Sequence, residues 1–346
     1  MNHLAINASK PPASHTKPPI LFKYLLITRF GWIAQLIDQD EAVTLHCDAL
    51  EQVSSPHPDQ PTSLNNLANA LHARFFKTGQ LVDLDEAIEM HREALTMRPV
   101  PHPNRPTSLN NLANCLCTRF GQKGQLVDLD EAVCMHQEAL GLRRAPHPDR
   151  SVSLNNLAVV LVARFGRMNL FVDVDEAVKL HRDALELVSP PHPDRPTLLN
   201  NLASALCVCF YETGHLTDLI EAVGMHREAL SLGSASHPDP SALLNNLANS
   251  LCMLFNQTGQ LVNLNEAVWF HRQALELLSP PDPSRSTSIN NLANSLCMLF
   301  NQTGQLVDLD EAVWLHRQAL ELLSPPHPGR STSINNLANS LCMLFN

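Results

Sequence analysis

Apolar residues recur along the chain at the spacing of two short amphipathic helices in every 45 residues. Within residues 61–105, the first stripe falls at positions i, i+3, i+4, i+7 and i+11, and it consists of Leu64, Leu67, Ala68, Leu71 and Phe75. A second stripe follows a short stretch containing Gly79, and it consists of Leu84, Ala87, Ile88, His91, Ala94 and Leu95. This spacing predicts two α-helices, each with one buried face.

The same pattern repeats along the chain at a constant interval. The triplet Asn-Asn-Leu begins every 45 residues, at Asn65, Asn110, Asn155, Asn200, Asn245, Asn290 and Asn335. A Glu-Ala pair recurs at the same interval, at Glu41, Glu86, Glu131, Glu176, Glu221, Glu266 and Glu311. Chance does not produce seven matches at one spacing, so the sequence predicts a tandem array of one unit.

Prolines and capping residues indicate where each helix begins and ends. Connectors such as Pro101-His102-Pro103 cannot continue a helix and therefore separate the units. Asp83 and Glu86 have the spacing of a capping box, which predicts that Asp83 caps the second helix. We expect six helix–turn–helix units, at residues 61–105, 106–150, 151–195, 196–240, 241–285 and 286–330.

Both flanks depart from the repeated unit. Residues 1–18 are polar and Pro-rich, and we expect a disordered leader there. Residues 19–60 are a degenerate first repeat, in which Phe22-Lys23-Tyr24 stands in place of Asn-Asn-Leu. Residues 331–346 match the first helix of a further unit, a half repeat. Because a solenoid needs a polar cap, we expect a truncated piece of a longer protein, or else a partner that covers this edge.

Neither short helix can bury its apolar stripe alone. Stacking the units buries the stripes in one continuous core, so that each unit is stabilised by its neighbours. The predicted fold is all-α, an α-solenoid of helix–turn–helix repeats that winds into a right-handed superhelix.

The unit resembles a tetratricopeptide repeat at Asn66-Leu67-Ala68, Glu86-Ala87, Ala94-Leu95 and Pro99. The longer form, with His-Pro-Asp before Leu-Asn-Asn-Leu-Ala, resembles the repeats of kinesin light chains. With Arg-Phe ending the first helix and Asp-Leu-Asp-Glu-Ala opening the second, it resembles fungal arrays that often precede a caspase-like CHAT peptidase domain. The resemblance implies the solenoid fold strongly and the function only weakly, because one fold serves many functions.

The first helices supply the candidate binding residues. At 100° per residue, Thr62, Asn66, Asn69 and Ala73 lie opposite the apolar stripe, and the resemblance places this side in a concave groove. Amides donate and accept, so a row of them can bind the backbone of an extended peptide. The predicted groove residues are Asn66, Asn69, Asn111, Asn114, Asn156, Asn201, Asn246, Asn249, Asn291, Asn294 and Asn336. The alternative is that these amides bond within the array.

The neighbouring residues favour other interpretations. For Asn65 and its equivalents we favour a structural role. Arg74, Arg119 and Arg164 occur only in the early units, so an acidic ligand would prefer residues 61–195. The histidine of each second helix, such as His91, is expected to be a packed, hydrogen-bonded core residue, and that of each connector, such as His102, a turn residue. Equivalent residues of stacked units do not converge, so we predict no metal site and no cofactor.

Composition narrows the function further. The net charge is −10, from 24 basic and 34 acidic residues, which argues against nucleic acid. No segment predicts an export signal or a membrane span, and nine scattered cysteines are typical of a reduced, cytoplasmic chain. We find no catalytic motif. The sequence predicts a non-enzymatic scaffold that binds a protein or peptide. The alternatives are a regulatory or sensor array of a longer fungal protein with a CHAT domain, and a solenoid that self-associates through its uncapped C-terminal edge.

Overall fold

The computed structural model describes residues 40–52, 57–233, 239–280, 282, 284–323 and 329–344. The predicted leader at 1–18 and most of the degenerate repeat at 19–60 lie outside the described residues. A helix covers residues 40–51. The first helices of the repeats are α2 (Gln60–Thr78), α4 (Arg105–Lys123), α6 (Arg150–Met168), α8 (Arg195–Thr213), α10 (Pro240–Thr258), α12 (Arg285–Thr303) and α14 (Arg330–Met343). The second helices are α3 (Leu81–Thr96), α5 (Leu126–Leu142), α7 (Phe171–Glu186), α9 (Leu216–Gly233), α11 (Leu261–Leu277) and α13 (Leu306–Leu322).

Backbone chemistry at the helix ends explains the sharp turns. Proline stands at the start of α2, α4, α8 and α10, where its missing N–H removes no helical hydrogen bond. At the C-terminal end of α2, Gly79 has φ of 70° and donates its N–H to the carbonyl of Phe75. This left-handed conformation favours glycine. Asn169 adopts it after α6, with φ of 53°, as asparagine can.

The predicted apolar stripes form the core. Leu67, Ala68 and Leu71 are at most 2 % exposed, and so are Leu84 and Ala87 of the partner helix. Burying a leucine side chain contributes roughly 1.5–3 kcal/mol, and neither helix could do so without the other. The all-α solenoid predicted from the spacing is therefore confirmed.

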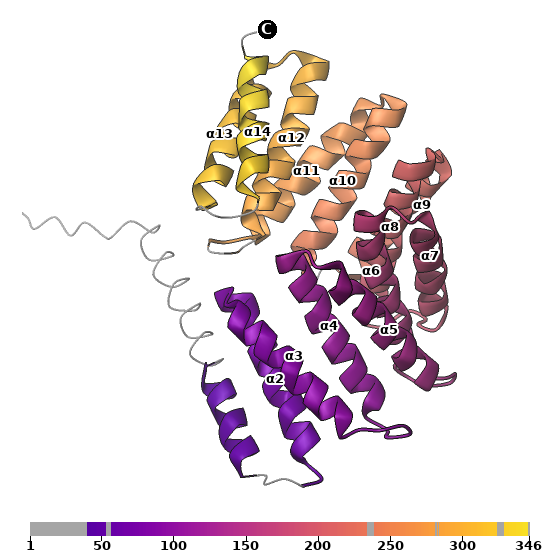
Figure 1. Cartoon of the computed structure of the whole chain (residues 1–346). Coiled ribbons are helices and arrows are strands. Elements are labelled where there is room, and N and C mark those ends of the chain that lie inside the picture. Colours follow the sequence, from indigo (N-terminus) through magenta and orange to yellow (C-terminus); the bar gives the residue numbers. More distant parts are fainter. Residues whose placement is uncertain are drawn as a thin grey trace, which may run out of the picture.

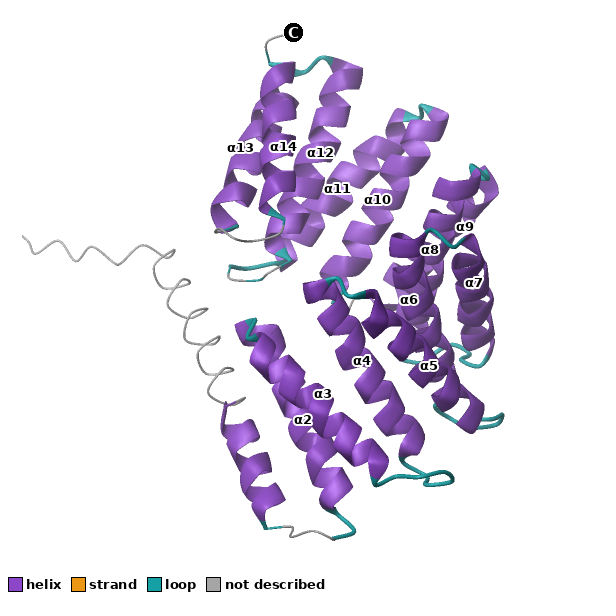
Figure 2. Ribbon diagram, in the orientation of Figure 1, coloured by secondary structure: helices purple, strands orange, loops and turns teal. Residues whose placement is uncertain are grey.

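The repeats curve because their two kinds of helix pack differently. The backbone of each first helix comes within 8 Å (Cα to Cα) of the next first helix, whereas no two second helices among α3–α13 approach one another so closely. The first helices therefore line the inner side of the curve and the second helices its outer side. In Figure 1, α7 and α9 lie outside α6 and α8, and the described ends of the chain come round toward the same side. Figure 2 shows that every element of the described part is a helix.

The predicted capping box is wrong. The N-cap of α3 is Gln80, which makes no side-chain capping bond, and Asp83 lies inside the first turn, 2 % exposed. Its carboxylate accepts hydrogen bonds from Nε and Nη2 of Arg74, at 2.9 and 2.8 Å. A carboxylate here is still favourable to the helix dipole, but its partner is a guanidinium of the preceding helix, which sequence spacing alone did not indicate.

Candidate functional site

An uncharged stripe runs along the inner side of the array. It consists, in α2, of Thr62, Asn66, Asn69, Ala73 and Phe76, and of their equivalents every 45 residues in the later first helices. We call this surface the inner stripe. All of its described members are exposed or half-buried, and none is charged. It can therefore offer hydrogen bonds and apolar contact, but no ion pairs of its own.

The first row of predicted groove asparagines takes part in the packing of the repeats. The side-chain amide of Asn111 donates to Oδ1 of Asn65 in the preceding repeat, at 3.2 Å. The same bond recurs from Asn201 to Asn155 at 3.0 Å and from Asn246 to Asn200 at 3.0 Å. These three residues therefore join neighbouring first helices, as the structural alternative foresaw.

Other members of the Asn65 series have the structural role expected for Asn65 and its equivalents. Asn65 and Asn110 are buried, at 8 % and 6 % exposed. Oδ1 of Asn110 lies 3.0 Å from Nδ1 of His136 on the second helix of the same repeat. His271 with Asn245 and His316 with Asn290 repeat this contact at 3.1 Å. These asparagines thus connect the two helices of a repeat.

The second row is more accessible than the first. Asn69, Asn114, Asn249 and Asn294 are exposed, and no side-chain hydrogen bond forms at any of them within the described residues. Asn339 of α14 is also exposed, whereas Val159 and Ser204 interrupt the row in α6 and α8. The structure therefore leaves the amides of this row open to a ligand.

A mostly apolar hollow, which we call the inner hollow, lies beside the inner stripe toward the C-terminal ends of α6 and α8, with Arg167 and Glu212 also in its wall. It has a volume of about 450 Å³, and its wall includes Val208 and Tyr211 of α8, Met253 of α10 and Gly166 of α6. The Tyr211 side chain is 80 % exposed. The repeat pattern does not predict a role for Tyr211, although an aromatic side chain in a mostly polar stripe is a usable signal. The inner hollow offers space for an apolar side chain.

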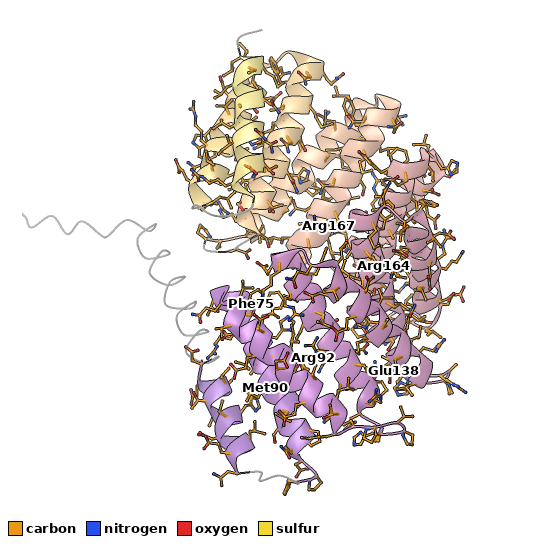
Figure 3. The ribbon with its side chains drawn as sticks, viewed as in Figure 1. Phe75, Met90, Arg92, Glu138, Arg164 and Arg167 are labelled. Atoms are coloured by element: carbon orange, nitrogen blue, oxygen red, sulfur yellow. The ribbon has the colours of Figure 1, made fainter. Side chains whose placement is uncertain are left out.

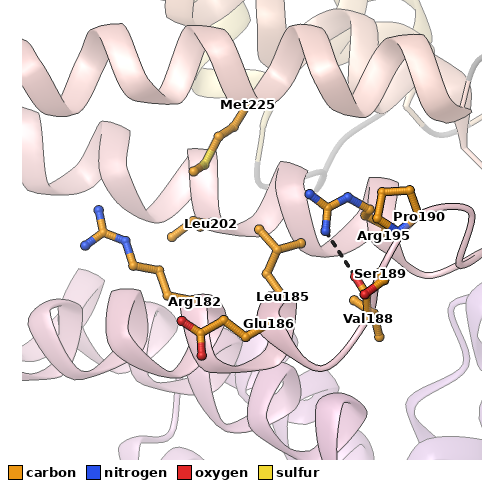
Figure 4. A pocket seen from close by; sticks show the side chains of 9 residues that line it. All are labelled: Arg182, Leu185, Glu186, Val188, Ser189, Pro190, Arg195, Leu202 and Met225. Atoms are coloured by element: carbon orange, nitrogen blue, oxygen red, sulfur yellow. Dashed lines mark hydrogen bonds between the residues drawn. The ribbon is translucent and has the colours of Figure 1, made fainter.

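A second hollow lies between α7, α8 and α9 (Figure 4) and has a volume of about 480 Å³. Leu185, Leu202 and Met225 form its apolar part. Its two guanidinium groups are already engaged. Arg195 donates to the carbonyl of Val188 at 3.0 Å, the dashed line in Figure 4, and Arg182 pairs with Glu221 at 3.0 Å. We therefore rank the inner hollow above this one as a ligand site.

The arginines that could have favoured an acidic ligand are internally paired. Arg119 bonds Asp128 at 2.6 Å, and Arg164 (labelled in Figure 3) bonds Asp173 at 2.8 Å. The side chains of both arginines are about one-fifth exposed or less, and each bonds two oxygens of its carboxylate. The expectation that an acidic ligand would prefer residues 61–195 thus loses its basis.

The histidines of the second helices are buried, as expected, but the expected hydrogen bond is not general, because neither ring nitrogen of His91 has a partner among the described residues. The exposed fraction is at most 2 % for His91, His136, His181, His226, His271 and His316. Burial lowers the pKa of each to about 4, because a charged imidazole cannot be solvated there. The connector histidines are turn residues, since Nδ1 of His102 accepts the backbone N–H of Asn104 at 3.1 Å.

The cysteines form no disulfide within the described part of the chain. Cys252 and Cys297 are half-buried, with Sγ 3.3 and 3.2 Å from Oγ of Ser295 and Ser340 in the following helix, and Cys342 is exposed. Among the residues that the structure describes, no group of three metal-ligating side chains comes together, and no helix is long and apolar enough to cross a membrane.

Comparison with known families decides what kind of repeat this is. The family model described as tetratricopeptide repeat matches residues 62–103 and 107–149. The other repeats have the same helix pair at the same interval. The two matched repeats are tetratricopeptide repeats, and the described chain is an array of such helix pairs. Arrays of this type are typically protein-interaction scaffolds. The fungal, CHAT-associated part of the resemblance stays a prediction. No curated protein matches the chain.

Solved structures with a similar arrangement include the yeast Tom70, at 16 % identity and a TM-score of 0.51, covering 89 % of this chain and 60 % of that one. The nearly identical TPR-like repeats of a Podosopora anserina protein assigned as a kinesin light chain match at 23 % identity and a TM-score of 0.45, covering 63 % and 98 %. A thermophilic TPR protein of Thermus thermophilus matches at 18 % identity and a TM-score of 0.47, covering 68 % and 99 %. At these identities, the Tom70 likeness supports the fold alone.

Proposed function

We propose that the inner stripe binds an extended peptide or protein segment. The observation that carries this proposal is an uncharged stripe whose second-row amides are exposed and free of internal hydrogen bonds in the described residues, at Asn69, Asn114, Asn249, Asn294 and Asn339. Exposed amides along a stack of helices can pair with the N–H and C=O groups of an extended backbone.

The inner hollow would fix the position of such a ligand along the inner stripe. Val208, Tyr211 and Met253 present apolar surface beside the amides of the same helices. A peptide whose backbone lies along the second row could place one aliphatic or aromatic side chain there. Buried apolar anchors supply much of the affinity of protein–peptide interfaces, so the hollow should contribute more than any single amide.

The structure also determines which variants test the proposal cleanly. Replacing Asn111 or Asn201 would remove a bond between repeats as well as a ligand contact. Asn249→Ala with Asn294→Ala removes only exposed amides, and Tyr211→Ala removes an exposed ring. A control is Gln273→Ala on the outer side, a half-buried amide whose side chain bonds only Glu276 in the described residues.

The experiment pans a displayed library of random peptides against the full chain and measures the selected peptides by fluorescence anisotropy. The double asparagine variant should weaken binding about thirtyfold, at about 1 kcal/mol for each of two lost hydrogen bonds, with circular dichroism unchanged. Tyr211→Ala should weaken it at least as much, and Gln273→Ala should not. Peptides that bind both inner-stripe variants as tightly as the original chain would refute the proposal.

A further inference from the structure

The two ends of the described array expose the two halves of one repeat. The helix over residues 40–51 has the sequence pattern of a second helix, because Asp-Glu-Ala-Val, Leu45-His46 and Ala49-Leu50 match residues 310–320 of α13. At the other end, α14 is a first helix, and its 14 residues repeat the opening residues of α12. The first-helix partner of the one and the second-helix partner of the other are not among the described elements.

The α14 helix exposes the face that α13 covers on α12. Ile334 is 46 % exposed, whereas its equivalent Ile289 is 3 % exposed. Ala338 is exposed while Ala293 is fully buried. Since the two helices have the same sequence, the difference comes only from the absence of a covering helix among the described residues.

The helix over residues 40–51 shows the complementary exposure. Val43, on the side toward α2, is 7 % exposed and belongs to the core. On its other side, Leu45 is 60 % exposed, whereas the equivalent Leu315 packs against α12 and is 3 % exposed. This is the side that contacts a first helix in every complete repeat.

We infer that α14 of one molecule and the helix over residues 40–51 of a second molecule join to complete a repeat, linking copies of the chain head to tail. The contact would continue the interface already present between α12 and α13. Leu45 would lie where Leu315 lies, against Ile334 and its neighbours. His46 would face Asn335, as Nδ1 of His316 faces Oδ1 of Asn290 at 3.1 Å.

The segment before residue 40 competes for the same face, but its sequence fits poorly. Aligned on the 45-residue period, Lys23 falls at the position of Ala68. That position is an alanine with no exposed surface in every described complete repeat: Ala68, Ala113, Ala158, Ala203, Ala248 and Ala293. A lysine at such a position would bury a charge without a partner. The identical sequence of α12 and α14 favours the second copy instead.

The interface joins two different surfaces, so the assembly is heterologous and its two ends can be blocked separately. Leu45→Glu blocks one end and Ile334→Glu the other. Both side chains are exposed in the single chain, so both variants should fold. Val262→Glu is the matched control, because Val262 is 65 % exposed in the middle of the array.

Sedimentation velocity of the full chain over a wide concentration range tests the inference. The original chain and Val262→Glu should grow beyond dimers as concentration rises, and each end variant alone should stay monomeric. An equal mixture of the two end variants should form dimers and nothing larger, because only one productive interface remains.

A monomeric original chain, or assembly that survives Leu45→Glu, would overturn the inference, as would a Val262→Glu variant that fails to assemble. Loss of assembly with Ile334→Glu but not with Leu45→Glu would indicate a symmetric α14–α14 contact instead. None of these variants alters the inner stripe, so peptide binding is tested independently.

Discussion

The early repeats join their helices with charged groups in places where the late repeats use apolar ones. In the repeats of α2–α7, Arg74, Arg119 and Arg164 bond the buried carboxylates of Asp83, Asp128 and Asp173. In the later repeats, Cys209, Leu254 and Leu299 occupy the arginine positions, opposite Asp218, Asn263 and Asp308. The helices nevertheless pair in the same way in both regions, and the second helices differ in length by at most two residues.

At the end of the second helices, too, buried arginines of the early repeats are replaced by apolar residues in the late repeats. Arg98 and Arg143 are 3 % and 5 % exposed, and each bonds the hydroxyl of a serine in the next first helix, at 2.6 and 3.0 Å. Val188, Leu278 and Leu323 take this position later and are equally buried. The first of these exchanges is incomplete, because Oδ2 of Asp308 is buried without a hydrogen-bond partner among the described residues, and a buried carboxylate without its partner is costly. The comparison shows that the constant leucines, alanines and histidines hold the fold, not the ion pairs.

The largest expected effect is the loss of stability at low pH that comes from the buried histidines, which the early and late repeats share. The pKa of each of the six buried histidines is about 4, and in the unfolded chain it returns to about 6.5. Between these values only the unfolded chain binds the proton. Stability is therefore complete above pH 6.5 and falls toward pH 4, by up to about 1.4 kcal/mol per pH unit for each histidine.

Circular dichroism melts between pH 7 and pH 4 measure this effect. Hydrogen exchange should show that early and late repeats lose protection together. His271→Gln should reduce the steepness of the pH dependence by about one proton. A melting temperature that stays constant down to pH 5, or a loss confined to the early repeats, would contradict the prediction.

A smaller effect tests the ion pairs themselves. Arg74→Leu leaves the carboxylate of Asp83, 2 % exposed, without its guanidinium, and should cost roughly 3 kcal/mol in the free energy of local unfolding. Adding Asp83→Asn should recover most of the loss, because a late repeat already has leucine and asparagine at these two positions, Leu254 and Asn263. There the Asn263 amide donates to Thr258, and Thr78 occupies the equivalent position in the early repeat.

Hydrogen exchange of α2 and α3 at neutral pH follows both variants. Leu254→Met, which retains an apolar side chain in the late repeat, serves as the control and should change protection little. If the double variant is no more stable than Arg74→Leu, then the two regions are not interchangeable and the comparison fails.

The smallest effect concerns the outer side, where ion pairs join successive second helices. Arg92 (labelled in Figure 3) pairs with Glu131 at 2.9 Å, Arg182 with Glu221 at 3.0 Å, and Arg272 with Glu311 at 2.7 Å. Gln137 interrupts the series opposite Glu176. Gln137→Arg should stabilise the array by about 0.5 kcal/mol, the usual gain from an exposed pair.

Urea unfolding at low and high salt checks this prediction. The gain from Gln137→Arg should shrink as salt rises, because exposed pairs are screened. Arg182→Gln, the reverse change, should cost a similar amount. A gain that persists in high salt would mean that the new arginine acts through packing rather than charge.

Much of the site could be predicted from residue type and spacing, because each residue of a helix is rotated by about 100° from the one before it. The spacing therefore determines on which side of the helix a residue lies. The inner position of Asn69 and Asn249 and the buried positions of Leu67 and His91 follow from that geometry alone. The bond from Asn111 to Asn65 did not follow, since it crosses between repeats and depends on how far one first helix lies from the next. The hollow beside Tyr211 is likewise made by α6, α8 and α10 together.

The sequence by itself determined the repeat, its two helices and the solenoid, because helical periodicity and a constant 45-residue interval are local properties of the chain. Only the tertiary structure decided which polar side chains remain available. Arg74 and Asp83 are both charged, but in the fold they bond each other and are not available to a ligand. The amide of Asn69 makes no bond within the described residues, whereas the amide of Asn111 bonds Asn65. Such pairing depends on distances between helices that no local pattern encodes.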